Sequence, residues 1–289
     1  MNGLHNGLVN GLESGLYSRG EGMANGLVFD TDRVVASSLL RGVAAYWKLD
    51  QTKIGSGLWA RDELSLYNAL TILLYKGNPG HNVSLSASNV ITQGKISTGL
   101  NFVASLSGFI DANPFTNGGD STILELGPTD HTISVWIKLT SLPVQFANIF
   151  MKGAYGATRT YNLLRVNSTG RVDSGVSYNF DGAYDFLTSN TILKINTWYH
   201  ILTTRNVSSR KIETFINGVK DTAVTASLGT LIYNYAPNRG CNIGATVGGV
   251  HFFNGVISEL GIWTRALQEH ERIFLYNKGF GVSYPFVLN

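Results

Sequence analysis

The chain has 289 residues, of which 44% are hydrophobic and 14% are charged, and its formal net charge is +3. This length and apolar content suffice for one large or two small globular domains. The small charge, with no Lys/Arg run longer than two residues, argues against nucleic acid as a partner. The single cysteine excludes an intramolecular disulfide framework, and no apolar stretch is long enough for membrane insertion as a spanning helix.

The first 32 residues form a glycine- and leucine-rich segment that differs from the rest of the chain. A four-residue unit places glycine before leucine four times, at Leu4, Leu8, Leu12 and Leu16. Glycine at every fourth position costs a helix about 1 kcal/mol each relative to alanine, so the segment does not hold a shape of its own. The regular leucines predict an extended arm, residues 1–32, that becomes ordered against a partner; the alternative is a flexible low-complexity tail.

Residues 33–289 show the two-residue periodicity of β-strands, and we expect them to form one domain. Alternating apolar residues predict strands, each with one buried face, over 43–49, 132–139, 198–205, 211–216 and 256–263. In the last strand, Val256, Leu260 and Ile262 are expected on the same face. The pair Asn217-Gly218 directly follows the fourth of these strands, which predicts a tight hairpin.

One helix is predicted near the end of the sequence, over 267–277. Leu267, Phe274 and Leu275 share a face there, and Gly279 suits the residue that follows a helix. Strands joined by turn-rich connections, without strand–helix alternation, predict an all-β fold. We expect a two-sheet antiparallel jelly-roll sandwich with one short C-terminal helix and the extended N-terminal arm.

Five parts of the sequence resemble, in their order and spacing, the laminin-G-like and concanavalin A-like jelly-roll family. They are 42–50, 99–102, 131–138, 196–200 with 215–219, and 253–267 with 275–277. The resemblance implies two curved antiparallel sheets that bind glycans or proteins and seldom catalyse a reaction. It also implies a place for structural calcium near Ser258-Glu259, where Asp62, Asn68 and Glu259 would supply oxygen ligands. The alternative is a protein without a cofactor, in which these side chains are solvated or hydrogen-bonded.

Catalysis is not expected from this sequence. The family that the sequence resembles includes catalytic members, the retaining glucanases, which use two carboxyl groups about 5 Å apart as acid and nucleophile. The chain has no Glu-x-Asp-x-Glu pattern, and Glu269 and Glu271 fall on the predicted helix. His200 lies within a predicted strand and is expected to be a hydrogen-bonded core residue.

A candidate glycan site lies in tyrosine-rich segments, of which 178–185 is the clearest. Sugar binding requires aromatic faces and a few amide or carboxylate partners, commonly on loops. The candidate residues are Tyr155, Arg159, Tyr178, Asp181, Tyr184, Tyr233 and Tyr235. The alternative is that these aromatic residues fill the core or a subunit contact.

The closing motifs, at 275–277 and 284–286, are similar to those of laminin-G-like modules in tailed-bacteriophage virion proteins. Together with the arm, this similarity implies a non-enzymatic phage structural protein that decorates the head or belongs to a tail or fibre. Its arm would bind other virion proteins or further copies in a homo-oligomer, for which we expect a trimer, and its sandwich would face a host surface glycan. The location would be the virion, assembled in the host cytoplasm. The alternative is a cellular or secreted carbohydrate-binding and adhesion module.

Overall fold

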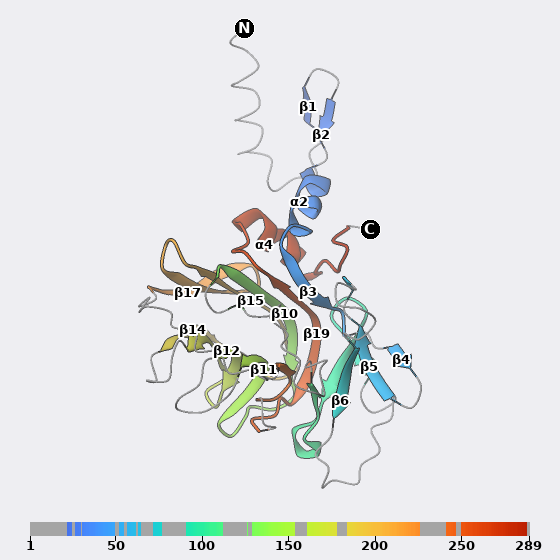
Figure 1. Cartoon of the computed structure of the whole chain (residues 1–289), viewed down its shortest axis with the longest axis vertical. Helices are drawn as coiled ribbons and strands as arrows, with labels where there is room; N and C mark the ends of the chain where they lie inside the picture. Colours follow the sequence, from blue (N-terminus) through green and yellow to red (C-terminus); the bar gives the residue numbers. More distant parts are fainter. Residues whose placement is uncertain are drawn as a thin grey trace.

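The computed structural model describes residues 22–24, 27–29, 31–49, 52–54, 57–61, 63–64, 72–76, 91–111, 126, 129–153, 161–177, 184–225, 241–246 and 250–287. These residues form two facing antiparallel β-sheets (Figure 1). The predicted two-sheet antiparallel sandwich with a short C-terminal helix is confirmed. Among these residues, no helix has the length and apolar character needed to cross a bilayer.

The first sheet has eight strands in the order β17-β16-β15-β10-β19-β8-β7, and β3 also pairs with β19. Along one side of β19 runs β10; along the other side β8 and β3 follow one another. The strand bounds are β3 (Val43–Trp47), β7 (Ile91–Gln93), β8 (Thr98–Phe102), β10 (His131–Leu139), β15 (Trp198–Asn206), β16 (Lys211–Ile216), β17 (Val219–Thr225) and β19 (Gly255–Trp263).

The second sheet has nine strands in the order β14-β13-β12-β11-β18-β9-β6-β5-β4. Their bounds are β4 (Thr52–Ile54), β5 (Gly57–Arg61), β6 (Ile72–Lys76), β9 (Phe109–Asp111), β11 (Phe146–Gly153), β12 (Tyr161–Asn167), β13 (Arg171–Ser177), β14 (Tyr184–Ile192) and β18 (Cys241–Ile243). A separate two-stranded ladder joins β1 (Gly22–Ala24) to β2 (Leu27–Phe29). The helical elements are α2 (Thr31–Leu39), η1 (Ala104–Leu106), α4 (Glu269–Tyr276) and η3 (Asn277–Gly279).

The main hydrophobic core lies between the two sheets. From β10 it receives Ile133, Val135, Ile137 and Leu139, the alternating set that the sequence predicted. Side chains from the nine-stranded sheet, such as Phe150, complete this core. The predicted strands at 132–139, 198–205 and 211–216 are confirmed.

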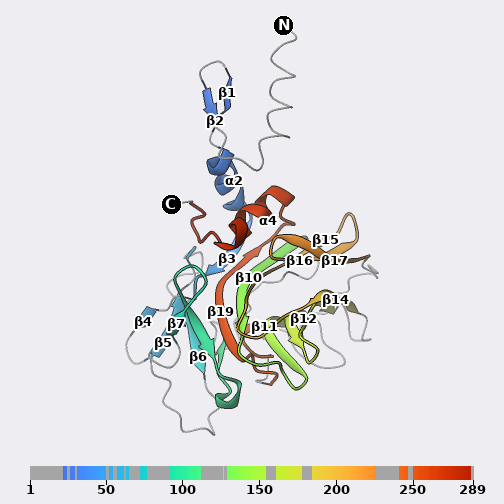
Figure 2. The same cartoon turned by 180° about the vertical axis from the view of Figure 1, so that it is seen from behind.

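The expectation of one buried face per strand is wrong for the centre of the eight-stranded sheet. Strands β10 and β19 are buried on both faces along almost their whole length. A second apolar cluster covers the outer face; its buried members are Leu39, Tyr46, Leu202, Phe215, Trp263, Leu267, Leu275, Val282 and Phe286. Figure 2 shows α2, α4 and the C-terminus gathered on this side of the molecule.

A β-bulge in β19 changes which of its residues face the main core. Between two paired positions β19 has one residue more than β10, and Glu259 takes a left-handed φ of 54°. The alternation shifts there, so that Ile257 joins Leu260 and Ile262 in the main core. The predicted placement of Val256 on that face is therefore wrong.

The local predictions for the hairpin, the helix and the buried histidine are confirmed. Asn217 and Gly218 take φ values of 53° and 77°, and β17 begins at the next residue. The predicted helix is α4, which buries Leu275. His200 is buried on β15, its Nε2 lies 2.8 Å from the Ser134 hydroxyl, and burial lowers its pKa to about 3.

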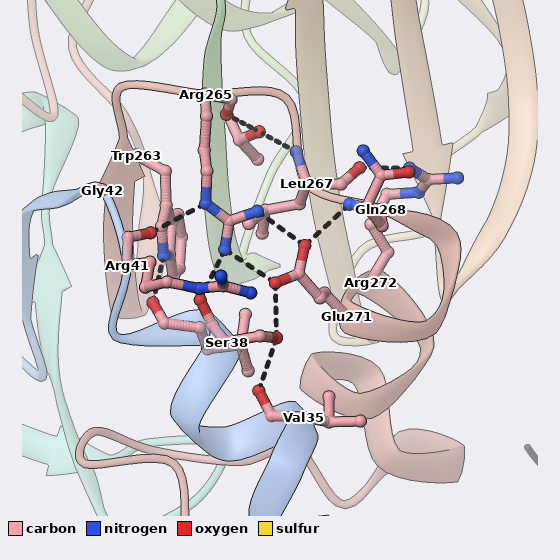
Figure 3. A network of polar contacts seen from close by, with 12 residues as sticks. Val35, Ser38, Arg41, Gly42, Trp263, Arg265, Leu267, Gln268, Glu271 and Arg272 are labelled. Atoms are coloured by element: carbon pink, nitrogen blue, oxygen red, sulfur yellow. Dashed lines mark hydrogen bonds and ion pairs between the residues drawn. The ribbon is translucent and has the colours of Figure 1, made fainter. Parts of the chain in front are cut away.

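Helix α2, which the sequence analysis did not predict, is fixed to the sandwich by a polar network (Figure 3). The guanidinium of Arg265 donates to both carboxylate oxygens of Glu271, at 2.7 and 2.6 Å. It also donates to the carbonyl of Ser38 at 2.7 Å, and the Ser38 hydroxyl donates to Glu271 at 2.6 Å. The arm boundary expected after residue 32 thus falls within this helix.

Candidate functional site

The predicted tyrosine site falls almost entirely outside the described residues. This is the case for Tyr155, Arg159, Tyr178, Asp181, Tyr233 and Tyr235. Tyr184 is the first residue of β14, where its backbone pairs with Ser177. The arm leucines, Leu4, Leu8, Leu12 and Leu16, also lie outside the described residues. The tyrosine site and the assembly arm therefore stay predictions.

Of the three calcium ligands predicted, Asp62 and Asn68 lie outside the described residues as well. Glu259 is buried, and its Oε2 accepts hydrogen bonds from the hydroxyls of Tyr46 and Ser283, both at 2.8 Å. Within the described ranges, no three His, Cys, Asp or Glu side chains gather in a way that could hold a metal ion. The Glu259 oxygen thus already has two protein donors, and calcium stays a prediction.

A polar and aromatic group of side chains lies on the outer face of the nine-stranded sheet, and we call it the Arg165 cluster. Its members, from β11 to β14 and the segment before β19, are Phe146, Asn148, Arg165, Asp173, Phe186, Thr188 and His251. Strand register aligns four of them, because Asn148 pairs with Arg165, Arg165 with Asp173, and Asp173 with Thr188. Paired residues point to the same face, so these four side chains form one row across the sheet.

Strand alternation explains why the row points away from the core. On β12, Leu164 and Val166 are buried in the main core, so the side chain between them projects from the opposite face. On β13, Val172 fills the core in the same way beside Asp173. An extra residue in β11, relative to β12, follows Asn148 and restores the inward face at Phe150.

The Arg165 guanidinium lies close to two aromatic rings. Its central carbon is 3.5 Å from the ring centre of Phe146 and 5.2 Å from that of Phe186. Its Nε is 3.1 Å from Oδ2 of Asp173. The planar cation therefore covers an aromatic face while the carboxylate fixes its orientation.

Asp173 is itself held by two further donors. Its Oδ1 accepts hydrogen bonds from the Asn167 amide and the Thr188 hydroxyl, both at 2.9 Å. The side chain of Asp173 is only 7% exposed and that of Arg165 is 13% exposed. The carboxylate is thus a fixed part of the cluster, and it balances the charge of Arg165.

Asn148 is the least satisfied polar residue of the cluster. It is 1% exposed, and neither Oδ1 nor Nδ2 of its side chain has a hydrogen-bond partner. A buried polar group without a partner costs about 1 to 3 kcal/mol. Native proteins rarely keep such a group unless another molecule, such as water or a ligand, satisfies it.

His251 completes the cluster beside Phe146. Its ring meets the Phe146 ring edge-on with the centres 5.4 Å apart, and its Nε2 is 3.2 Å from the side-chain oxygen of Gln145. Burial lowers the pKa of His251, and the nearby charge of Arg165 lowers it further. The imidazole is therefore neutral at pH 7, which leaves Arg165 and Asp173 as the charged members of the cluster.

The Arg165 cluster was not predicted from the sequence, because the predicted glycan site lies in tyrosine-rich segments such as 178–185. Its residues lie mainly on strands that were not predicted individually. A usable signal exists in 161–167 and 171–177, where a charged residue directly follows an apolar one, Arg165 after Leu164 and Asp173 after Val172. This pattern identifies outward-facing charges, but the row itself depends on the register between strands.

Comparison with known proteins identifies the superfamily of the fold. The family model of the concanavalin A-like lectin/glucanases superfamily matches residues 116–271, more than half of the chain. No curated protein matches the sequence. Domain 4 of AbnA, a GH43 extracellular arabinanase from Geobacillus stearothermophilus, solved in complex with arabinotriose, is similar in structure. The identity is 15%, the TM-score is 0.55, and 83% of this chain and 98% of that chain are covered.

Two further solved structures share the fold over most of this chain. For the binding domain of Paraclostridial Mosquitocidal Protein 1 the identity is 17% and the TM-score 0.53, with 80% of this chain and 52% of that chain covered. For Trypanosoma rangeli sialidase in complex with 2,3-difluoro-KDN the identity is 13% and the TM-score is 0.51. The match covers 83% of this chain and 33% of the sialidase chain. This chain thus spans about half of the first protein's structure and a third of the sialidase. The family match and the two-sheet sandwich show that the chain belongs to the concanavalin A-like lectin/glucanases superfamily.

Proposed function

We propose that this protein is a non-catalytic carbohydrate-binding module whose site is the Arg165 cluster. The observation that carries the proposal is the buried amide of Asn148, which has no partner and lies next to Arg165 in the same row. Sugar hydroxyls both donate and accept hydrogen bonds, as this amide requires. The rings of Phe146 and Phe186 supply the apolar surface that sugar C–H groups need.

Binding without turnover is part of the proposal. Glycoside hydrolysis needs one carboxyl group as acid and a second as nucleophile or base on opposite sides of the scissile bond. In the Arg165 cluster the one carboxylate, Asp173, is held by Arg165, Asn167 and Thr188. A reducing-sugar assay on the purified protein tests this point, and turnover that persists through purification would contradict it.

Replacing Asn148 with leucine is expected to weaken glycan binding without weakening the fold. Leucine has a similar size but no polar atoms, so the substitution removes an unsatisfied amide and leaves stability unchanged or higher. Loss of its hydrogen bonds to the sugar should lower affinity about 10-fold. Titration calorimetry with arabinotriose and the best ligands from a glycan array measures affinity, and urea unfolding measures stability.

Asn242 offers a matched control for this substitution. It is also buried in the nine-stranded sheet, on β18, but its Nδ2 donates to the carbonyl of Thr246 at 2.8 Å. Asn242→Leu should therefore lower stability, by about 1 to 3 kcal/mol, because the carbonyl loses its donor. Equal losses of stability in both variants, or an unchanged affinity for Asn148→Leu, would contradict the role given to Asn148.

A second candidate function is a structural component of a bacteriophage virion. The supporting observation is that Ser38, Arg265 and Glu271 hold α2 against α4. Helix α2 follows the Gly-Leu arm in the sequence, so it fixes the point at which the arm is attached to the sandwich. In this proposal the Gly-Leu arm joins copies of the chain or binds other virion proteins, and the sandwich is displayed.

Deleting residues 1–30 is expected to abolish assembly while the sandwich stays folded, since the network that fixes α2 is kept. Light scattering coupled to size-exclusion chromatography should show an oligomer, expected to be a trimer, for the full chain and a monomer for the truncated one. Thermal unfolding of the two should agree. An unchanged molar mass would count against the arm as an assembly segment.

A further inference from the structure

The charges of the Arg165 cluster cancel locally. The guanidinium of Arg165 is paired with Asp173 at 3.1 Å, and both side chains are largely buried. Arg171, two residues before Asp173 on β13, donates to the main-chain carbonyls of Ser189 and Asn190. The other side chains of the cluster are the amide of Asn148, the hydroxyl of Thr188, the rings of Phe146 and Phe186, and His251.

Asp173 cannot easily move aside for an incoming acidic group. Its two oxygens accept hydrogen bonds from Arg165, Asn167 and Thr188, three side chains on the two strands β12 and β14. A carboxylate ligand that approached Arg165 would share the guanidinium with Asp173 at short range. Because both groups are negative and poorly screened by solvent, this arrangement is unfavourable.

An uncharged sugar meets no such repulsion. The Nδ2 and Oδ1 of Asn148 are buried and have no partner in the protein; once a sugar reaches them, Nδ2 would donate to one hydroxyl and Oδ1 would accept from a neighbouring one. N–H groups of Arg165 that Asp173 does not use remain donors for hydroxyl oxygens, and a hydroxyl gains from them without displacing the ion pair. The chemistry of the row therefore favours a pair of adjacent hydroxyls over a carboxylate.

We propose that the Arg165 cluster selects uncharged sugars over acidic ones, and that Asp173 is the residue that sets this selectivity. The inference rests on the proposed carbohydrate-binding function and adds the ligand class to it. The negative charge of Asp173 neutralises Arg165 and repels an acidic ligand. Asp173 is therefore a specificity-determining residue even where it makes no contact with the sugar.

The test compares ligands that differ in a single carboxylate. An array of paired oligosaccharides, such as 3′-sialyllactose with its methyl ester, is applied to the wild-type protein, with arabinotriose as a further neutral probe. Neutral members should bind at least about 10-fold more tightly than their acidic counterparts. Acidic members that bind as tightly or more tightly would overturn the inference while leaving carbohydrate binding intact. Binding to no glycan on the array would instead reject the proposed function itself.

Asp173→Asn tests the assignment of selectivity to this residue. The amide keeps the shape of the side chain but leaves the Arg165 charge uncompensated, so the neutral-to-acidic affinity ratio should fall about 10-fold or reverse. Binding of 3′-sialyllactose to this variant should weaken with added salt.

Asp221→Asn is the matched control, since it changes net charge equally at a carboxylate that does not belong to the cluster. Asp221 accepts the backbone N–H groups of Asn190 and Thr191. An affinity ratio that stays at the wild-type value in Asp173→Asn, or that shifts equally in both variants, would overturn the assignment. If Asp173→Asn does not fold, the ratio of neutral to acidic affinity in the wild-type protein still decides whether the site prefers uncharged sugars.

Discussion

Replacing Glu271 with glutamine will lower the free energy of unfolding by about 3 kcal/mol and loosen α2 from the sandwich (Figure 3). Glu271 is 1% exposed and accepts hydrogen bonds from Arg265 and Ser38. A neutral amide cannot accept the bidentate pair from Arg265, and the guanidinium is left without its counter-charge. Urea unfolding at pH 7 measures the loss, and faster hydrogen exchange in 31–39 reports the loosening of α2.

The same carboxylate makes wild-type stability depend on acidity. Burial by itself raises the pKa of Glu271, but hydrogen bonds from Arg265, Ser38 and the N–H of Gln268 outweigh it and lower the pKa to about 2. A carboxyl group whose pKa is lower in the folded protein stabilises it above the unfolded value near 4.5. This stabilisation should disappear as the pH falls from about 5 to about 2, and the glutamine variant should lack this part of the acid dependence.

Glu269 provides the control for both measurements. It lies on the same helix, in its first turn, and is exposed. Glu269→Gln should change stability by less than about 0.5 kcal/mol. Similar losses for the two glutamine variants would show that the network around Glu271 does not hold α2.

Replacing Gly255 with alanine should cost at least about 3 kcal/mol or prevent folding. Gly255 begins β19 with a φ of 145°, and a Cβ there would lie 2.2 Å from the carbonyl oxygen of Lys138. That atom is backbone in the central strand β10, so it cannot rotate away. The free energy of unfolding, or the soluble yield if the variant does not fold, measures the effect.

Gly279→Ala separates this clash from the cost of a positive φ. Gly279 has a φ of 93°, yet a Cβ there would come no closer than 3.4 Å to the hydroxyl oxygen of Tyr276. We expect a loss of about 1 to 2 kcal/mol from backbone strain alone. If both variants lost the same amount, the close approach of β10 to β19 would not be the cause.

The sandwich core was predictable because alternation along a strand is local information. Ile133, Val135 and Ile137 identify the inward face of β10 without reference to any other strand. The cover on the opposite face was not predictable in this way. Thr132 reads as a solvent-facing residue, but its hydroxyl donates to the carbonyl of Arg265 and accepts the N–H of Leu267 from far along the chain.

Helix α2 and the Arg165 cluster were missed for a related reason. The α2 sequence has adjacent β-branched residues, Val34 and Val35, and two serines, which favour a helix only weakly. Contacts with Glu271 and Trp263 hold it instead, the latter through the indole N–H donating to Leu39 at 2.8 Å. In the Arg165 cluster, the row depends on the pairing of four strands and on a bulge, which no single segment encodes.

The outer faces of the two sheets differ in the described part of the chain, because only that of the eight-stranded sheet carries the second apolar cluster with α2 and α4. Helix α2, through which the N-terminal part enters, contributes Leu39 to the apolar cluster on the outer face of the eight-stranded sheet. The Arg165 row lies on the outer face of the other sheet. Attachment through the N-terminus, to a sensor surface or to a scaffold that carries many copies, would therefore leave the face with the Arg165 row exposed. Weak contacts made by the Arg165 rows of several copies would then combine to give high avidity.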